Sequence, residues 1–509
     1  MSGLMSSRIL QKAASCTLSF SCSASLQWMQ IGGRSTAGAL GGRSLSTRQN
    51  MDFQLNQIQV NSILQANEQA VSIPGFDGRS LSAVRKFESN HLAANTPNED
   101  RHSAATCLQT PGTLFGVFDG HGGWACAQAV SERLLSYVAI AMMSQRRLEE
   151  LEWLTEQGRP VPAVLQWYKH RGDTVSYQKS ASFYRDQLRV FWQELLDHGE
   201  HGDGMSPAEA MDYAFKRLDT DLSLEAQGPL PSDLLKSTAI QVAFTGCTAC
   251  VAHLDLEGIH VANAGDCRAV LGVQEDDGSW TALPLSRDHN AQNPAELQRV
   301  RAGHPPSETA TVVSEDRLLG VLMPLRAFGD VSFKWSRELQ SGVLQSLESG
   351  VDLDSLNMYH HTPPHYLTPP YLDAAPEVLY HKLRPQDRFL ILGSDGLWDE
   401  MGSQRAVQLV GEHLSGVHLQ APVSDQRLKL GQMQELLQSR SARATRPSDL
   451  NAATHLLRHA LGTGDRGQLC PGRLAAMLAL PEELARMYRD DVTATVVYLN
   501  SDLSEPQES

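Results

Sequence analysis

The 509-residue sequence predicts an α+β protein built on antiparallel sheets. Residues 238–283 contain short strand-like runs separated by turn signals at 256–258, 265–266 and 277–278, a pattern typical of consecutive β-hairpins. Helical patterns are grouped between the strands instead of alternating with them, which argues against a parallel sheet. The composition, 41% hydrophobic and 20% charged, is that of a soluble globular chain, and no run of about 18 apolar residues predicts a membrane span.

The first 51 residues differ from the rest of the chain in charge. They contain no Asp or Glu, and five basic residues give them a charge of +5. Because the whole chain carries −15, residues 52–509 carry −20. An acid-free segment rich in Arg and Ser is typical of a mitochondrial transit peptide, although a disordered tail can have the same composition. We expect a transit peptide and disordered start at 1–51, an N-terminal lead-in at 52–94 and a short tail at 501–509.

The eight cysteines do not indicate a zinc site. Cys247 and Cys250 form the only C-x-x-C pair, and no second pair could complete a structural zinc centre. The pair lies in an apolar run that reads as a strand, where residues three apart face opposite sides. We therefore expect reduced thiols that bind no metal.

The N-terminal half begins with less regular segments. Residues of about 70–110 read as loop, strand and loop, and the apolar run 113–118 predicts a strand that stops at Asp119. Apolar residues at helical spacing predict a helix over 124–143, and 144–205 reads as helices with loops.

Further elements carry clearer boundary signals. Residues 206–222 predict an amphipathic helix, because Ser206 and Glu209 form a capping box at its start. The apolar runs 388–393 and 492–499 predict two buried strands.

Two segments of the C-terminal half read as surface elements. Residues 344–374 contain His360, His361 and His365, but their Pro-Pro pairs favour a loop over a metal site. Residues 402–485 read as polar helices, within which 421–452 resembles a variable insertion.

Acidic residues stand at the ends of several predicted strands, beside Gly or another acid. One Asp-Gly pair is usually only a turn, but strand ends of one sheet can converge on one edge. Clustered carboxylates repel one another unless cations neutralise them, and oxygen ligands favour Mg²⁺ or Mn²⁺ over zinc. Two such ions can activate a water for in-line attack on phosphorus. The acids concerned are Glu99, Asp100, Asp119, Asp266, Asp395, Asp490 and Asp491.

Six short motifs follow one another along the chain: VFDGHGG (117–123), TGCTA (245–249), ANAGDCRAVL (262–271), RAFGD (326–330), SDGLWD (394–399) and RDDVT (489–493). In these motifs the sequence resembles the metal-dependent Ser/Thr protein phosphatases of the protein phosphatase 2C type. The resemblance covers roughly residues 95–500 and implies an α-β-β-α sandwich with a binuclear Mg²⁺ or Mn²⁺ site at one end. It also implies insertions at about 144–205, 335–374 and 402–485.

The resemblance implies a role for each acid that matches a motif. Asp119 corresponds to the carboxylate that bridges both metals, and Gly120 to a ligand that uses its backbone carbonyl. Asp395 and Asp490 correspond to ligands of one metal, and Glu99 to a ligand of the other.

The remaining matches are to supporting groups. Asp100 is similar to an outer acid that holds a water on the metal, and Asp266 to an acid that, with Asp395, supports a weaker third metal. His121 corresponds to the general acid that protonates the leaving Ser or Thr oxygen, a role that suits imidazole because it titrates near neutral pH.

The sequence departs from the family where phosphate is usually bound. Members commonly place an Arg four residues before the metal-binding Glu, and here that position is Asn95. An amide can donate to phosphate but lacks the charge of Arg. We assign phosphate binding to Asn95, which leaves open how phosphate is held without the usual Arg. Asp491 stands where the family often has Asn, so Asp490 is the better candidate for the ligand.

Longer segments, among them 87–110, 317–330 and 484–493, resemble one subgroup of the family, the pyruvate dehydrogenase phosphatases. This implies a protein-serine/threonine phosphatase of the mitochondrial matrix that reactivates the phosphorylated E1 component of the pyruvate dehydrogenase complex and docks on the E2 lipoyl domain. It leaves open the isoform, calcium dependence, a regulatory subunit and the cleavage site of the transit peptide.

Two other functions remain to be weighed. A catalytically inactive binding scaffold of the same fold would have lost metal-binding acids, whereas all of them are present. A two-metal nuclease would need clustered Lys and Arg for nucleic acid, and a chain of −20 without a basic stripe opposes that function.

Overall fold

The computed structural model describes residues 55–73, 82–170, 174–197, 202–230, 232–346, 363–416, 449–464 and 467–500. The predicted transit peptide and the tail lie outside these residues, as do His360, His361 and most of the predicted insertion at 421–452. Within the described ranges, no helix is both long and apolar enough to cross a membrane.

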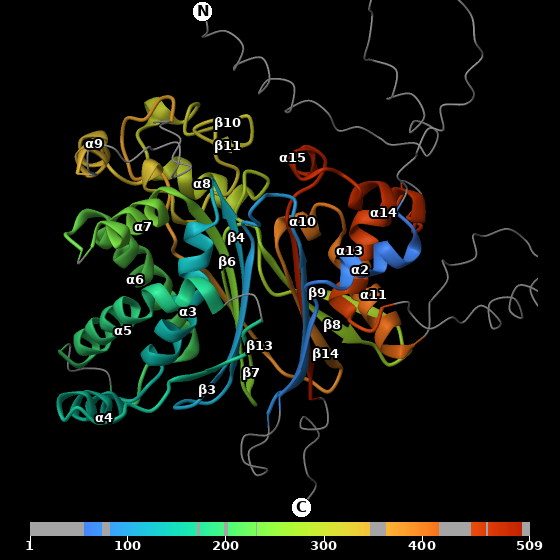
Figure 1. Ribbon diagram of the computed structural model, residues 1–509, viewed down its shortest axis with the longest axis horizontal. Helices are drawn as coiled ribbons and strands as arrows, with labels where there is room; N and C mark the ends of the chain where they lie inside the picture. Colours follow the sequence, from blue (N-terminus) through green and yellow to red (C-terminus); the bar gives the residue numbers. More distant parts are fainter. Residues whose placement is uncertain are drawn as a thin grey trace, which may run out of the picture.

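Two antiparallel sheets packed face to face form the centre of the molecule (Figure 1). The first has the strand order β1-β2-β15-β14-β8-β9, and the second β13-β7-β6-β4-β3-β5, with β12 also paired to β6. Helices cover both outer faces, which confirms the predicted α+β class and the α-β-β-α sandwich. The strands are β1 Gln69–Ser72, β2 Val84–Leu92, β3 Arg101–Cys107, β4 Thr113–His121, β5 Leu165–Trp167, β6 Gly246–Leu254, β7 Gly258–Ala264, β8 Arg268–Gln274, β9 Trp280–Pro284, β10 Val313–Ser314, β11 Arg317–Leu318, β12 Phe328–Gly329, β13 Glu377–Lys382, β14 Asp387–Gly393 and β15 Val492–Leu499.

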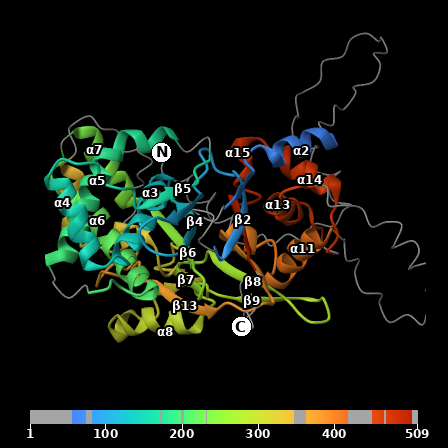
Figure 2. The same ribbon diagram turned by 90° about the horizontal axis from the view of Figure 1, so that it is seen from below.

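The two helical layers come from different parts of the chain (Figure 2). Helices α3 to α7 form the layer outside the second sheet, and α2, α11, α13 and α14 form the layer outside the first. The helices are α2 Gln57–Gln65, α3 Ala125–Ala141, α4 Gln145–Glu156, α5 Thr174–Asp197, α6 Pro207–Gln227, α7 Asp233–Phe244, α8 Pro294–Ala302, α9 Arg337–Gln345, α10 Asp395–Trp398, α11 Ser403–Ser415, α13 Ala452–Gly462, α14 Pro471–Leu478 and α15 Glu482–Ala485.

Apolar side chains fill the space between each pair of layers. Phe87 of the first sheet and Phe115 of the second meet edge to face between the sheets, with ring centroids 5.3 Å apart. Each such fully buried side chain contributes about 1.5–3 kcal/mol of transfer free energy. On β6, Cys247 faces the α3 layer and Cys250 faces the other sheet, so the pair points to opposite sides as predicted. Both are free thiols.

The helix predicted at 206–222 is α6, and its capping box is confirmed. Ser206 Oγ accepts the backbone N–H of Glu209, and the Glu209 carboxylate accepts the N–H of Ser206. A capping residue of this kind stabilises a helix by about 1 kcal/mol.

Two predictions within 238–283 are wrong. Residues 238–244 belong to helix α7, whose start is capped by Ser232, because a short apolar run does not distinguish a strand from a buried helix. The turn at Gly265-Asp266 does not close a hairpin either. It joins β7 of the second sheet to β8 of the first, so the chain crosses between sheets there.

Three other segments are more ordered than their sequence suggested. The stretch 70–110 contains strands β1, β2 and β3 instead of one strand. Because β2 pairs with β15 along its whole length, the boundary expected at residue 95 does not separate structural units. The region 402–485 is not uniformly polar, since every residue of α13 is buried.

His289 holds the crossover between the sheets. The backbone N–H of Gly265 donates to His289 Nδ1 at 3.2 Å, and the backbone N–H of His289 donates to the Gly265 carbonyl at 2.9 Å. The ring is 1% exposed, and burial lowers the pKa of His289 to about 4. Only the neutral ring can accept at Nδ1, so this turn depends on an uncharged imidazole.

Acidification should therefore weaken the fold through His289. The unfolded chain binds a proton near the ordinary pKa of 6.5 and the folded chain only near 4, so stability is lost as the pH falls between these values. The loss is at most about 3 kcal/mol. In urea denaturation at pH 7 and pH 4.5, His289→Gln keeps an acceptor but should lose this part of the pH dependence. Identical pH dependence in wild type and variant would contradict this role.

Candidate metal centre

The elements that carry the predicted acids come together at the end of the sandwich where α10 and α15 lie (Figure 1). Asp119 is near the C-terminal end of β4 in the second sheet, and Asp395 follows β14 in the first. Asp490 precedes β15, which runs antiparallel to β14, so the start of one strand lies beside the end of the other. Asp266 reaches the same end from the β7–β8 crossover.

The strand that carries Asp119 is longer than predicted. β4 does not stop at Asp119 but continues through His121, because Asp119, Gly120 and His121 pair with Thr248, Cys247 and Gly246 of β6. This pairing fixes the backbone of the whole motif in the sheet.

The carboxylates at this end repel one another in a poorly solvated space. Burial, then repulsion from Asp395 and other acids, holds the pKa of Asp119 well above its usual range. Burial and the neighbouring acid Asp491 raise the pKa of Glu99 to about 7. Burial and Asp395 raise the pKa of Asp266 to about 8, and burial and Asp490 raise the pKa of Asp395 to about 6. The charged forms of these groups need a compensating cation.

The donor set suits a hard divalent cation. Asp395 Oδ1 is buried without a hydrogen-bond partner, which leaves an oxygen available to a ligand. At Gly120 a Cβ atom would lie 2.5 Å from the Glu99 carbonyl oxygen, so the two backbones approach closely only because the residue is glycine. Within the described part of the chain, no three His, Cys, Asp or Glu side chains have the arrangement of a complete metal site. The site suits a divalent cation because it is negatively charged, because its donor atoms are oxygens and because Asp395 Oδ1 has no hydrogen-bond partner.

Asp491 has a different task from Asp490. Its carboxylate accepts the backbone N–H groups of Asn95 and Glu99, each at 2.8 Å, and also that of Ala94. It is thus used to hold the loop that carries Glu99, whereas the Asp490 side chain is half-buried and repels Asp395. This division agrees with the choice of Asp490 as the ligand candidate, which stays a prediction.

Asn95 takes part in the same loop. Its Nδ2 donates to Asp491 Oδ2 at 3.0 Å, which leaves one amide N–H for any other acceptor. The structure gives Asn95 a loop-fixing role, and its assignment to phosphate remains a prediction.

Asp100 is buried behind the cluster. Ser394 Oγ donates to Asp100 Oδ2 at 2.7 Å and accepts the backbone N–H of Thr493 at 3.0 Å. Burial and the charge of Asp491 raise the pKa of Asp100 well above its usual range. Asp100 therefore links β3 to the Ser394 turn, a place consistent with the outer position predicted for it.

His121 is paired with a residue that had no predicted role. Its Nε2 lies 2.6 Å from Asp330 Oδ2. Burial alone would lower the pKa of His121, but the attraction and hydrogen bond of Asp330 outweigh it and raise that pKa. Asp330 adopts a left-handed conformation with φ 48°, and a Cβ at Gly246 would overlap both side chains. The RAFGD motif was visible in the sequence, but nothing in it relates Asp330 to a histidine 209 residues away.

The backbone around Asp330 is held from behind. The Gly329 N–H donates to Asp219 Oδ1 at 2.9 Å, and Lys334 Nζ donates to the same carboxylate at 2.7–2.8 Å. The Asp330 N–H donates to the Thr245 carbonyl at 2.9 Å. These bonds tie β12 to α6 and β6 and fix the carboxylate that meets His121.

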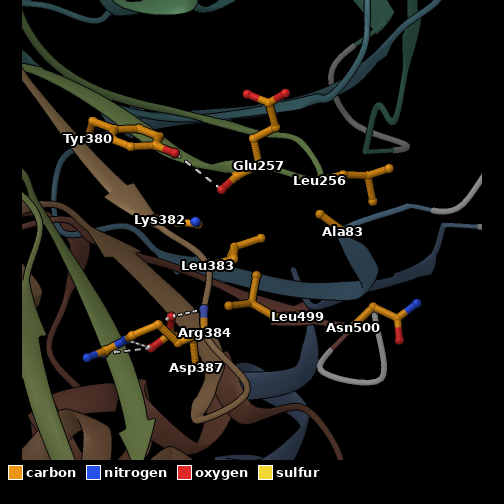
Figure 3. Close-up of a pocket in the computed structure, with 10 residues that line it drawn as sticks. All are labelled: Ala83, Leu256, Glu257, Tyr380, Lys382, Leu383, Arg384, Asp387, Leu499 and Asn500. Atoms are coloured by element: carbon orange, nitrogen blue, oxygen red, sulfur yellow. Dashed lines mark hydrogen bonds and ion pairs between the residues drawn. The ribbon is translucent and has the colours of Figure 1, made fainter. Parts of the chain in front are cut away.

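A cavity of ≈ 490 Å³ lies at the opposite end of the sandwich (Figure 3). Its lining includes Tyr380, Arg384 and Leu499, and the Arg384 guanidinium binds the buried carboxylate of Asp387. Because β14 and β15 carry their site residues at their other ends, this cavity is separate from the acid cluster.

Comparisons with known proteins identify the family of this chain. A protein-family model described as protein phosphatase 2C matches residues 173–439. The human mitochondrial [pyruvate dehydrogenase [acetyl-transferring]]-phosphatase 2 is 54% identical over 90% of this chain and 86% of its own length. The human mitochondrial phosphatase 1 of the same name is 53% identical over 91% of this chain and 86% of its own length. A crystal structure of serine-threonine phosphatase 2C from Toxoplasma gondii aligns with 85% of this chain and 99% of its own at 17% identity and a TM-score of 0.38, too low for comparing site geometry.

Divalent cations should stabilise the folded chain through Asp119. We expect millimolar Mn²⁺ to raise the melting temperature of the wild type, since a ligand at 100 times its Kd adds about 2.7 kcal/mol. Asp119→Asn should respond much less, because it removes a charge from the centre of the cluster. Asp212→Asn, on the exposed side of α6, is the control and should keep the full shift. An undiminished shift in Asp119→Asn would refute the assignment.

Proposed function

This chain belongs to the protein phosphatase 2C family, and we propose that it is a metal-dependent protein-serine/threonine phosphatase of the pyruvate dehydrogenase complex. The observation that carries the proposal is the gathering of acids from both sheets beside a histidine held by an aspartate. Its relatives that are 53–54% identical are named as pyruvate dehydrogenase phosphatases, and the match covers about nine-tenths of this chain.

The acid cluster would hold two Mg²⁺ or Mn²⁺ ions. Asp119, Asp395, Asp490 and Glu99 would contribute carboxylates, and Gly120 its backbone carbonyl. When bound, such ions neutralise charge and lower the pKa of water so that it can attack phosphorus in line. Asp100, which lies behind Ser394, would accept a hydrogen bond from a water on the metal. Asp266 would form, together with Asp395, a weaker site for a third metal ion.

His121 supplies the proton that the leaving group needs. A serine alkoxide is a poor leaving group, so proton transfer to its oxygen lowers the barrier. The raised pKa of His121 keeps part of the imidazole protonated near neutral pH, and Asp330 fixes the ring through Nε2. The proton must then leave from Nδ1, because Nε2 is engaged by Asp330.

The names of the relatives support the proposed substrate and a mitochondrial location. We place the activity on phosphoserine of the E1 component, whose dephosphorylation reactivates the complex, and in the mitochondrial matrix. Docking on the E2 lipoyl domain belongs to the same proposal, as does a regulatory subunit, and nucleic acid is not a partner. The inactive scaffold is disfavoured because the acids converge at one end with a histidine beside them.

Turnover should depend on the acid cluster. We expect the wild type to release phosphate from a phosphoserine peptide of E1 with Mg²⁺ or Mn²⁺ and to stop in EDTA. Asp119→Asn and Asp395→Asn should each lower kcat by about 100-fold or more, since each removes charge equivalent to several kcal/mol of transition-state stabilisation. Asp212→Asn should retain full activity. Turnover that survives EDTA, or survives in both variants, would rule out the mechanism, and peptide binding without turnover would indicate a scaffold.

The contribution of the His121–Asp330 pair to kcat should increase with the basicity of the leaving group. We expect His121→Ala and Asp330→Asn to lower kcat on phosphoserine peptide by roughly 10²-fold, the usual contribution of general acid catalysis. On p-nitrophenyl phosphate the loss should be less than about 5-fold, because an aryl oxide leaves without a proton. Equal losses on both substrates would count against proton donation by His121.

A further inference from the structure

The loop that should bind phosphate contains no cation. Residues 93–97 read Ala-Ala-Asn-Thr-Pro, and the Asn95 amide already donates to Asp491. A phosphoserine dianion brings two negative charges to a site that is itself acidic. Recognition without a guanidinium or ammonium would lack the charge-assisted hydrogen bonds that usually hold phosphate.

Three arginines lie within four residues of Glu99 or Asp490, and two of them are committed to backbone. Arg101 Nη1 donates to the carbonyls of Asn98 and Asp100, each at 2.7 Å. Arg489 donates to the carbonyls of Ala93 and Asp490. Both guanidinium groups therefore hold loops in place.

The third, Arg486, is placed differently. Arg486 directly follows helix α15, and helix-like turns continue from there to Arg489. Arg486 and Asp490, four residues apart in the sequence, therefore lie on the same side of this segment. The Arg486 guanidinium forms an ion pair with the Asp490 carboxylate, and no other carboxylate of the proposed ligand set has an arginine as a direct ion-pair partner among the described residues. It also attracts Glu99 and Asp395 electrostatically.

Arg486 is open to a large substrate. Its side chain is 54% exposed, although it touches a half-buried carboxylate. The neighbouring Met487 and Tyr488 are 74% and 51% exposed, so the segment that carries Arg486 lies at the protein surface. A cation bound by Asp490 would compete with Arg486 for that carboxylate, and the guanidinium would remain at the site with its fork of donors available.

We propose that Arg486 is the phosphate-recognising residue of this chain, which exchanges its ion pair with Asp490 for the phosphoryl oxygens of the substrate. The inference rests on the proposed function and adds to it the residue that supplies phosphate affinity. A planar guanidinium can donate two parallel hydrogen bonds to a phosphoryl group, a geometry that an ammonium or an amide cannot reproduce.

The test measures phosphate affinity with and without turnover. With saturating Mn²⁺, Arg486→Gln should raise both the KM for phosphoserine peptide and the inhibition constant of inorganic phosphate by about 10-fold or more, with kcat changed less than about 3-fold. Arg486→Lys should recover only part of the affinity. Arg473→Gln, which removes a partly buried arginine of α14 that is paired with Glu400, is the matched control and should leave both constants unchanged.

A second measurement distinguishes recognition from simple charge neutralisation. Calorimetry would give the affinities of each variant for Mn²⁺ and, in the Mn²⁺-loaded protein, for inorganic phosphate. Weaker phosphate binding by Arg486→Gln supports the proposal, even if the wild type proves unable to hydrolyse the peptide and the proposed function fails. Unchanged phosphate binding, whether or not Mn²⁺ then binds more tightly, would overturn it.

Discussion

The repulsion among crowded, buried and half-buried carboxylates at one end of the sandwich is the constraint on which the rest of this structure depends. Asp119 and Asp266 are held close to Asp395 by strands and a crossover that cannot separate without disrupting both sheets. Burial and the nearness of like charges raise the pKa values of these carboxyl groups. A fold that keeps such a cluster forgoes stability in the metal-free state, and we propose that divalent cations restore it.

The surrounding residues divide the work of holding this cluster. Asp491 binds the loop that carries Glu99, and Ser394 connects Asp100 to the start of β15. Asp330 is set by β12 and holds His121. Each of these groups is an anion or hydroxyl with its partners satisfied within the protein. The acids left facing the centre are those with no such partner or with an exchangeable one, as in the pair of Asp490 with Arg486.

Much of this arrangement could be predicted from the sequence because its signals are local. Apolar runs bordered by Asp-Gly or Asp-Asp indicated the strands and the acids together, and the capping box at Ser206 indicated where α6 begins. What could not be predicted depends on contacts across the chain. The pairing of His121 with Asp330, the role of Asp491 as a loop anchor and the change of sheet at Gly265 need the tertiary structure. The end of helix α7 was misread as a strand because residues 238–244 form a short apolar run, which does not distinguish a helix from a strand.

The central claim is that acids from both sheets form one cation site, and anomalous X-ray diffraction from crystals grown with Mn²⁺ tests it most directly. We expect two manganese peaks within coordination distance of Asp119. Asp395 and Asp490 should be ligands of one ion, and Glu99 should be a ligand of the other. Peaks elsewhere on the molecule, or no ordered manganese at Asp119, would contradict it.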